Sequence, residues 1–368
     1  MAAQNKSHDQ IVYLLQGGGA LGSYQVGVCE SLLESGCHPN WIVGTSIGAI
    51  NGAIIAGNKP ENRIPKLHEF WNSITFPYPC YFDTQDNSLV QEFQNHWYAQ
   101  LAALFGLPNF FKPRIFNLQM LLSSTPDKIS FYDTSELYET LKKVIDFDLI
   151  NQKKVRLTLG AVRIKAGRTV YFDNYCETIG PQHIMASSAL PPGFPAIKID
   201  DEYYWDGGLS SNTPFAVLLE EKAPQKLLCI IVNLFSFPNY LPSSLLEVYK
   251  YKKELEFASR HQRVLHYFSE LHFLQHSLHE LGKTRINHPE LEKALNKIKK
   301  LGHPTALNIA RFHYRDRQCN LWSKDYNFSH DAIREHWKAG LKDAEKALQD
   351  PSWMKFVENA SGAVIHEF

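Results

Sequence analysis

The residues best suited to chemistry in this 368-residue chain lie in the run Gly44-Thr45-Ser46-Ile47-Gly48. A G-x-S-x-G pattern is typical of a nucleophile elbow, a sharp turn that exposes a serine hydroxyl between a strand and a helix. Apolar residues 41–43 predict the strand, and the small residues after Gly48 predict a helix that packs closely on a sheet. Gly44 and Gly48 leave room for the strained turn. We therefore expect Ser46 to be a nucleophile, with a plain small-residue turn as the alternative.

A carboxylate stands in a second glycine-rich turn, Asp206-Gly207-Gly208. Residues 196–199 and 203–205 predict a hairpin that ends at this aspartate. Two glycines let a backbone approach another loop closely, and a carboxylate at a strand end could act as a general base. Asp-Gly is also an ordinary turn dipeptide, so the motif alone leaves a catalytic role and a purely structural role open.

Three consecutive glycines, Gly17, Gly18 and Gly19, follow the apolar run 11–16, and Gly22 opens a predicted helix. The pattern also satisfies the G-x-G-x-x-G of dinucleotide-binding proteins, which carry an acidic residue at the end of the second strand. Here the second strand ends in Gly44-Thr45-Ser46 instead. We therefore favour an oxyanion hole, in which the backbone amides of the loop stabilise the negative charge of a tetrahedral intermediate.

Histidines offer two further hypotheses. His183 lies just before the segment Ala186-Ser187-Ser188-Ala189 and is the first histidine to consider as a base. His272, His276 and His279 share one face of a predicted helix and could hold a metal, but no carboxylate or cysteine completes the set. A solvated histidine face is the simpler interpretation, so we expect no metal and no cofactor.

Composition and the chain's first residues limit which class of protein this can be. Lysine plus arginine equals aspartate plus glutamate, 38 against 38, so no overall field favours nucleic acid. The apolar run from Ile11 ends at Gln16, too short for a signal peptide or a membrane span. Six widely spaced cysteines without a C-x-x-C motif fit reduced thiols. We expect a cytoplasmic protein that could attach peripherally to membranes and has no nucleic-acid partner.

The elements that must position these motifs alternate between strand and helix, which predicts an α/β fold. Residues 60–130 show no clear period and are rich in aromatics and proline, so they could form a lid or acyl-binding wall, or a satellite core. From Ser244 to Leu281, apolar residues recur at intervals of three and four. This predicts a helix too long for a typical globular element, which could project and form a homodimer.

In this order, the glycine loop, the serine turn and the Asp-Gly-Gly turn resemble the motifs of the patatin-like phospholipases. The stretch from Ala186 to Pro195, and Asn212 with Pro214, also look like that family's. The resemblance covers about residues 10–235. It implies a three-layer α/β/α fold with a mainly parallel sheet in a catalytic domain over residues 8–240, followed by a mainly helical C-terminal extension over residues 241–368.

The resemblance also implies a serine lipid acyl hydrolase that cleaves fatty-acyl esters of phospholipids or lysophospholipids with a Ser46–Asp206 dyad. In that scheme Asp206 takes the Ser46 proton, the glycine loop holds the oxyanion, and water releases the fatty acid from an acyl-enzyme. An aspartate with an ordinary pKa near 4 is a weak base for serine, so the site must desolvate Asp206.

Two positions depart from the family pattern. Leu21 stands where many members carry a basic residue, and Gln16 where they often carry an acidic one. The missing positive charge makes neutral lipid, thioester or polyester substrates an alternative. A catalytically silent lipid-binding or scaffold protein is the alternative from another class, and the intact Ser46 and Asp206 argue against it.

Overall fold

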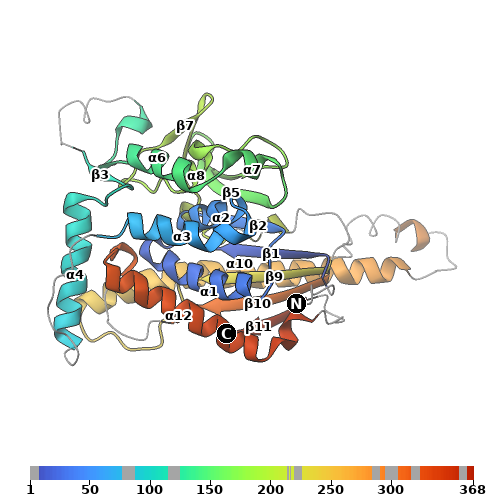
Figure 1. Ribbon diagram of the computed structural model, residues 1–368. Helices are drawn as coiled ribbons and strands as arrows, with labels where there is room; N and C mark the ends of the chain where they lie inside the picture. Colours follow the sequence, from blue (N-terminus) through green and yellow to red (C-terminus); the bar gives the residue numbers. More distant parts are fainter. Residues whose placement is uncertain are drawn as a thin grey trace.

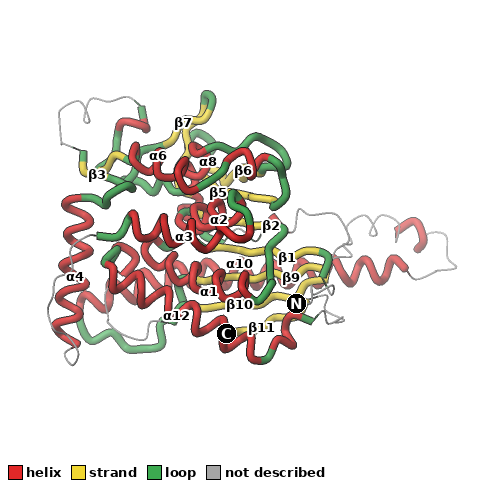
Figure 2. The backbone as a smooth tube through the Cα atoms, in the orientation of Figure 1, coloured by secondary structure: helices red, strands yellow, loops and turns green. Residues whose placement is uncertain are grey.

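The computed structural model describes residues 8–76, 88–114, 125–213, 215, 217–218, 226–283, 291–294, 306–315, 324–355 and 363–368 (Figure 1). Pro214 therefore lies outside the described residues. A central sheet runs through the molecule and helices pack beside it, as Figure 2 shows. This arrangement confirms the predicted α/β class.

The central sheet has nine strands in the order β11-β10-β9-β1-β2-β5-β8-β7, and β6 also pairs with β5. The strands are β1 (Gln10–Leu15), β2 (Trp41–Thr45), β5 (Arg156–Arg163), β6 (Arg168–Asp173), β7 (Ile197–Ile199), β8 (Glu202–Asp206), β9 (Lys226–Asn233), β10 (Ala306–His313) and β11 (Ala363–Glu367). From β11 to β5 every neighbouring pair is parallel. The β5–β6, β5–β8 and β7–β8 pairs are antiparallel, so the sheet is mainly parallel, as predicted.

The central strands are apolar on both faces because both faces are covered. In β1, Tyr13 and Leu15 belong to one buried cluster, whereas Val12 and Leu14 belong to another. Successive side chains of a strand point to opposite faces, so these two clusters are the cores above and below the sheet. The larger cluster packs against helices, and the smaller one includes Phe215 and Leu218.

The helices that follow the first two strands lie where the sequence predicts them. They are α1 (Gly22–Glu34), α2 (Ile47–Ala56), α3 (Pro60–Ser73), α4 (Ser88–Phe105), α6 (Ser135–Val144), α7 (Phe147–Asn151), α8 (Pro181–Ser187), α10 (Leu245–Lys283) and α12 (His330–Gln349). Ser329 accepts a hydrogen bond from the Ala332 amide at 3.3 Å and caps α12, as its sequence suggests. The remaining strands, β3 (Lys112–Pro113) and β4 (Tyr132–Asp133), form a separate antiparallel pair.

The aromatic-rich stretch from 60 to 130 is more regular than its sequence suggests. It contains α3 and α4, and α3 buries Leu67, Phe70 and Trp71 in the main core. Those residues recur at helical spacing, but the proline inside α3 hides the pattern. Phe110 also packs into this core. Residues 77–87 and 115–124 lie outside the described part, and the lid stays a prediction.

The part of the chain beyond residue 240 is mainly helical, yet it also supplies two strands to the central sheet. β10 pairs with β9 over its whole length, and β11 pairs with β10. Helix α12 packs against α1, whereas α10 projects beyond the body of the molecule (Figure 1). Its apolar side chains Leu255 and Leu271 are 41% and 49% exposed. The homodimer and the domain boundary at residue 240 stay predictions. The central sheet contains strands from both sides of that boundary.

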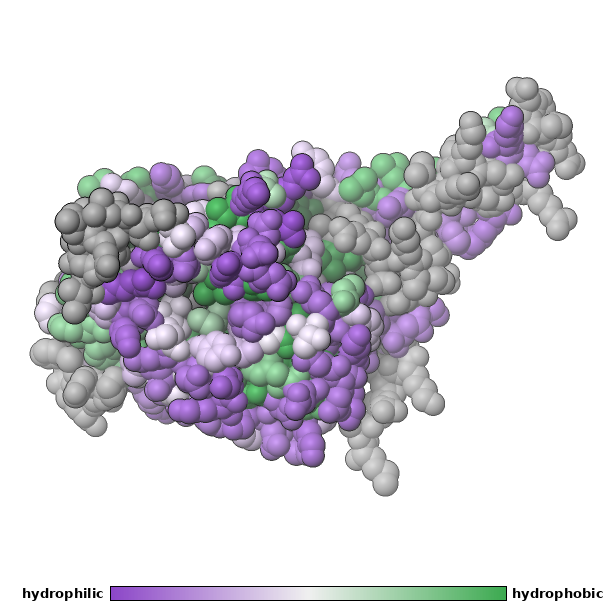
Figure 3. Space-filling view, turned by 90° about the horizontal axis from the view of Figure 1, so that it is seen from above, coloured by the Kyte–Doolittle hydropathy of each residue, from purple (hydrophilic) through white to green (hydrophobic). Residues whose placement is uncertain are grey.

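The surface on the side of α6 and β7 is mostly hydrophilic, with smaller apolar areas between the polar ones (Figure 3). Across the described ranges, no helix combines the length and apolar character that crossing a membrane requires.

Two glycines allow α1 and α12 to touch backbone to backbone. A Cβ atom on Gly340 would collide with the Tyr24 carbonyl, and one on Gly27 would collide with the Trp337 carbonyl. We expect Gly340→Ala to lower the free energy of unfolding by about 2 kcal/mol, because the overpacking outweighs the higher helix propensity of alanine. Urea unfolding followed by circular dichroism would measure this.

The matched control is Lys338→Ala on the exposed face of the same helix, which should change the free energy of unfolding by less than about 0.5 kcal/mol. Native stability in Gly340→Ala would contradict the close contact of α1 with α12.

Candidate active site

Ser46 sits at a strained turn between β2 and α2. Its backbone angles, φ 56° and ψ −127°, lie in a region that residues with a side chain rarely adopt. A Cβ atom on Gly44 would lie 2.7 Å from the Ala49 Cα, and one on Gly48 would lie 2.6 Å from the Leu15 carbonyl carbon. The turn therefore needs glycine at both positions, as expected for a nucleophile elbow.

Strand β5 brings Ser46 and Asp206 together, because β2 and β8 share one of its edges. Thr45 ends β2 opposite Gly160, and Asp206 ends β8 opposite the next residue, Ala161. β2 runs parallel to β5 and β8 runs antiparallel to it, so the two strands point toward each other and end at the same place. Two residues that are far apart in the sequence thus meet at one point of the sheet.

The Asp-Gly-Gly turn fits closely against this junction. A Cβ atom on Gly207 would lie 2.5 Å from the Gly160 carbonyl oxygen. The Gly208 amide donates a 2.7 Å hydrogen bond to Oδ1 of Asp206, which opens the short helix η3 (Gly207–Leu209). Both glycines therefore have a role in holding the aspartate.

Asp206 is buried, with 1% of its surface exposed. This burial raises the pKa of its carboxyl group to about 7, although hydrogen bonds from the Ser46 side chain and the Gly208 amide favour the charged form. Ser46 is partly exposed. The geometry thus combines an accessible hydroxyl with a buried carboxylate whose pKa suits a general base at neutral pH, which meets the desolvation requirement.

The end of α8 holds the elbow in place. The Ser46 amide donates to the Ser187 carbonyl at 3.1 Å, and the Ser187 hydroxyl donates to the Gly160 carbonyl at 2.6 Å. The Ser188 hydroxyl donates to the Ser46 carbonyl at 3.2 Å. The Asp206 amide donates to the Ala189 carbonyl at 2.9 Å. The Ala-Ser-Ser-Ala segment thus supports both predicted catalytic residues, a role that the sequence alone did not indicate.

The glycine loop lies beside Ser46. A Cβ atom on Gly17 would lie 2.9 Å from the Cβ of Ser46. Asn212, just after the Asp-Gly-Gly turn, donates a 2.9 Å hydrogen bond to the Gly17 carbonyl and so ties the turn to the loop. Gly18 lies against the Leu234 side chain, and Gly22 lies against the side chain of Ile47 in α2. The three motifs therefore form one continuous site.

The two departures from the family pattern have structural roles. Leu21 is fully buried in the main core. The Gln16 side-chain oxygen accepts a 2.6 Å hydrogen bond from the Leu234 amide, and the Gln16 carbonyl accepts one from Gln25 at 2.6 Å. Gln16 thus joins the end of β1 to the chain that follows β9.

A segment that sequence reasoning missed also reaches the site. The short helix η4 (Lys324–Tyr326) contacts η1 (Gly19–Leu21), and a Cβ atom on Gly19 would collide with the Asp325 carbonyl oxygen. Gly19 has a positive φ of 55°. Nothing in the local sequence of residues 324–326 marks it as part of a site, because its role depends on a contact with a remote loop.

The His183 side chain forms a hydrogen bond with the backbone at the start of α8. Its Nδ1 accepts a 2.9 Å hydrogen bond from the Gly180 amide, and its Nε2 lies 3.6 Å from Glu177. Burial lowers the pKa of the ring. Among the described residues, no group of three or more histidine, cysteine, aspartate or glutamate side chains gathers as metal ligands.

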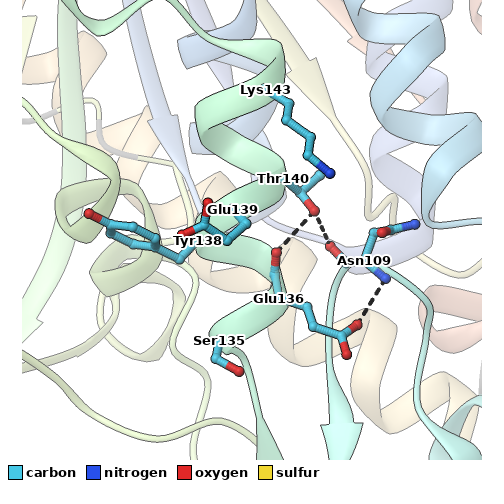
Figure 4. Close-up of a pocket in the computed structure, with 7 residues that line it drawn as sticks. All are labelled: Asn109, Ser135, Glu136, Tyr138, Glu139, Thr140 and Lys143. Atoms are coloured by element: carbon cyan, nitrogen blue, oxygen red, sulfur yellow. Dashed lines mark hydrogen bonds between the residues drawn. The ribbon is translucent and has the colours of Figure 1, made fainter.

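A separate pocket lies along α6 and the loop at Asn109 (Figure 4). Thr140 Oγ1 donates to the Asn109 carbonyl at 2.6 Å, and the Asn109 amide donates to Glu136 at 3.1 Å. The other lining residues are Ser135, Tyr138, Glu139 and Lys143. None of the predicted site residues lines this pocket.

Comparison with known proteins gives a family for this chain. A family model described as patatin-like phospholipase matches residues 13–219, and a second, described as patatin phospholipase, matches residues 255–360. Lysophospholipase nte1 of Aspergillus terreus is 33% identical in an alignment 107 residues long, and the match covers 23% of this chain and 7% of that protein. The chain thus aligns with only a small part of that relative.

Two solved structures resemble the chain. VipD from Legionella pneumophila is 15% identical, with a TM-score of 0.40 over 98% of this chain and 72% of that chain. A chain in the complex of SpcU with ExoU, from the type III secretion system of Pseudomonas aeruginosa, is 13% identical, with a TM-score of 0.29 over 96% and 75%.

The raised pKa of Asp206 predicts how stability depends on pH. The folded state holds the proton more tightly than the unfolded chain, whose pKa is near 3.8, so the free energy of unfolding falls as pH rises from about 4 to about 7. Asp206→Asn removes this penalty. We expect it to stabilise the protein by up to about 4 kcal/mol at pH 8, and little at pH 4, in urea unfolding.

Asp201→Asn, the same substitution at the exposed tip of the same hairpin, should show no such difference between the two pH values. An Asp206→Asn effect of equal size at pH 4 and pH 8 would contradict the raised pKa.

Proposed function

Since this chain belongs to the patatin-like phospholipase family, we propose that it is a serine lipid acyl hydrolase that cleaves fatty-acyl esters of phospholipids or lysophospholipids. The observation that carries the proposal is the meeting of β2 and β8 on β5, which places Ser46 beside the buried Asp206 carboxylate, whose pKa burial raises to about 7. An inactive lipid-binding protein would have no need for this costly arrangement of a strained serine and a desolvated acid.

In the proposed reaction, Asp206 accepts the Ser46 proton as the serine oxygen attacks the ester carbonyl. The amides of Gly18 and Gly19, with Gly17 beside the serine, stabilise the negative charge that develops on the carbonyl oxygen. Asp206 returns the proton to the leaving alcohol, which leaves an acyl-enzyme. A water molecule then gives a proton to Asp206 and attacks the acyl carbon. As the bond from the acyl carbon to the Ser46 oxygen breaks, Asp206 returns that proton to the serine oxygen, which releases the fatty acid and restores the free serine.

A neutral lipid ester is the second candidate substrate, and Leu21 is the observation in its favour. Leucine carries no charge and Leu21 is fully buried, so this position offers no positive charge to an anionic head group. Three exposed side chains lie near the dyad: Leu190, Leu209 and Tyr326. We propose that they contact a lipid surface and attach the protein peripherally to it. Leu190 follows Ala189, which bonds to Asp206, and Leu209 follows Gly208.

The test is hydrolysis with chelator present, on p-nitrophenyl butyrate and on vesicles of phosphatidylcholine, lysophosphatidylcholine or triacylglycerol. We expect Ser46→Ala and Asp206→Asn each to lower kcat by about 10⁴-fold, because both act in one proton transfer. Ser46→Ala should also lose labelling by a fluorophosphonate.

Ser73→Ala, a serine whose hydroxyl bonds within α3, is the matched control and should keep native activity. A native chain that hydrolyses no ester and takes no fluorophosphonate label would overturn the proposal in favour of lipid binding without catalysis. The order of rates on the vesicles separates phospholipid from neutral lipid substrates.

The pKa of Asp206 also predicts the pH profile. A general base works only in its deprotonated form, so kcat/KM should rise about tenfold per pH unit below pH 7 and level off above it. Initial rates on the p-nitrophenyl ester from pH 5 to pH 9 would measure this, with product detected at a fixed final pH. A rate that is already constant between pH 5 and pH 8 would exclude Asp206 as a base with this pKa.

A further inference from the structure

The glycine loop is held from outside by a segment of the C-terminal part. In η4, the main-chain carbonyl of Asp325 occupies the side of Gly19 where another residue would carry its Cβ atom. Gly19 adopts a positive φ of 55°, a conformation that glycine enters and leaves easily. The neighbouring carbonyl therefore restricts the one backbone position of the loop that has most freedom.

Two ion pairs fix η4 on helix α10. Lys253 Nζ lies 2.6 Å from both carboxylate oxygens of Asp325, and Lys324 Nζ lies 2.6 Å from Glu254 Oε1. Both segments carry a lysine followed by an acidic residue, and the two consecutive residues of α10 pair in crossed order with the two of η4. All four side chains are at most 27% exposed, so solvent screens these pairs less than surface pairs.

The chain after η4 is anchored separately. Phe328 stacks on Trp71 with ring centroids 6.4 Å apart, and its carbonyl accepts a 3.1 Å hydrogen bond from the Phe76 amide. Tyr326 lies between the two anchors, and the neighbouring Asp325 carboxylate and burial raise the pKa of its hydroxyl, with a smaller contribution from Asp206. The segment therefore reaches from α10 to the core across the glycine loop.

We propose that Lys253 and Asp325 are positioning residues for the oxyanion hole, acting through Gly19. The inference rests on the proposed function, because the loop amides must be aimed at a developing oxyanion. Donors stabilise a transition state most when they are already oriented before reaction. The ion pair keeps the Asp325 carbonyl against Gly19, and this contact keeps the Gly18 and Gly19 amides in one orientation.

The test replaces the charges without changing side-chain size. We expect Lys253→Met and Asp325→Asn each to lower kcat on p-nitrophenyl butyrate by about tenfold, less than the loss of an oxyanion donor, with KM changed by less than about threefold. Lys253→Arg keeps a two-point contact with the carboxylate and should retain kcat within about threefold. Hydrogen exchange of residues 17–21 should be faster in Asp325→Asn.

Glu367→Gln is the matched control, because it removes the partner of Arg311, 2.5 Å away, in the same C-terminal part without touching η4. It should leave kcat and the exchange of the loop unchanged. If the native chain is active and Asp325→Asn keeps both native kcat and native exchange, the positioning role is overturned alone. If the native chain is inactive on every ester, the proposed function and the positioning role are overturned together.

Discussion

The arrangement of the site depends on one buried carboxylate. Asp206 sits where β2 and β8, running in opposite directions along β5, both end. Burying a carboxyl group disfavours its charge, and only the hydrogen bonds from Ser46 and Gly208 oppose that effect. The strained turn at Ser46 ends β2 at this same point, so the proposed nucleophile lies beside the proposed base. Sheet register, burial and backbone strain therefore act on the same pair of residues.

Close backbone approach is the second constraint, and it explains why glycines recur in all three motifs. Gly48 lies against the end of β1, Gly207 lies against Gly160 on β5, and Gly17 lies against Ser46. Each contact joins two elements that a single methyl group would separate. Asn212 and the two serines at the end of α8, Ser187 and Ser188, then link the loops by hydrogen bonds. The site is rigid because its loops are tied to one another as well as to the sheet.

The C-terminal part belongs physically to the same fold. Its strands β10 and β11 extend the sheet, α12 packs on α1, and η4 lies against the glycine loop. Residues beyond 240 therefore support both the central sheet and the loop that holds the proposed oxyanion donors. A chain cut at that position would expose an edge of β9 and the outer face of α1.

The sequence determined the elements and motifs whose signals are local: the first strand, expected at 11–16 and found at 10–15, the serine elbow, the hairpin ending at Asp206, and the cap at Ser329. It also gave the order of the motifs, which is enough to indicate the family. It could not give β11, whose five residues have a weak local signal, or the pairing of Lys253 with Asp325. Only the tertiary structure decided those features, and the raised pKa of Asp206, because burial and ion pairing depend on residues that are remote in the chain.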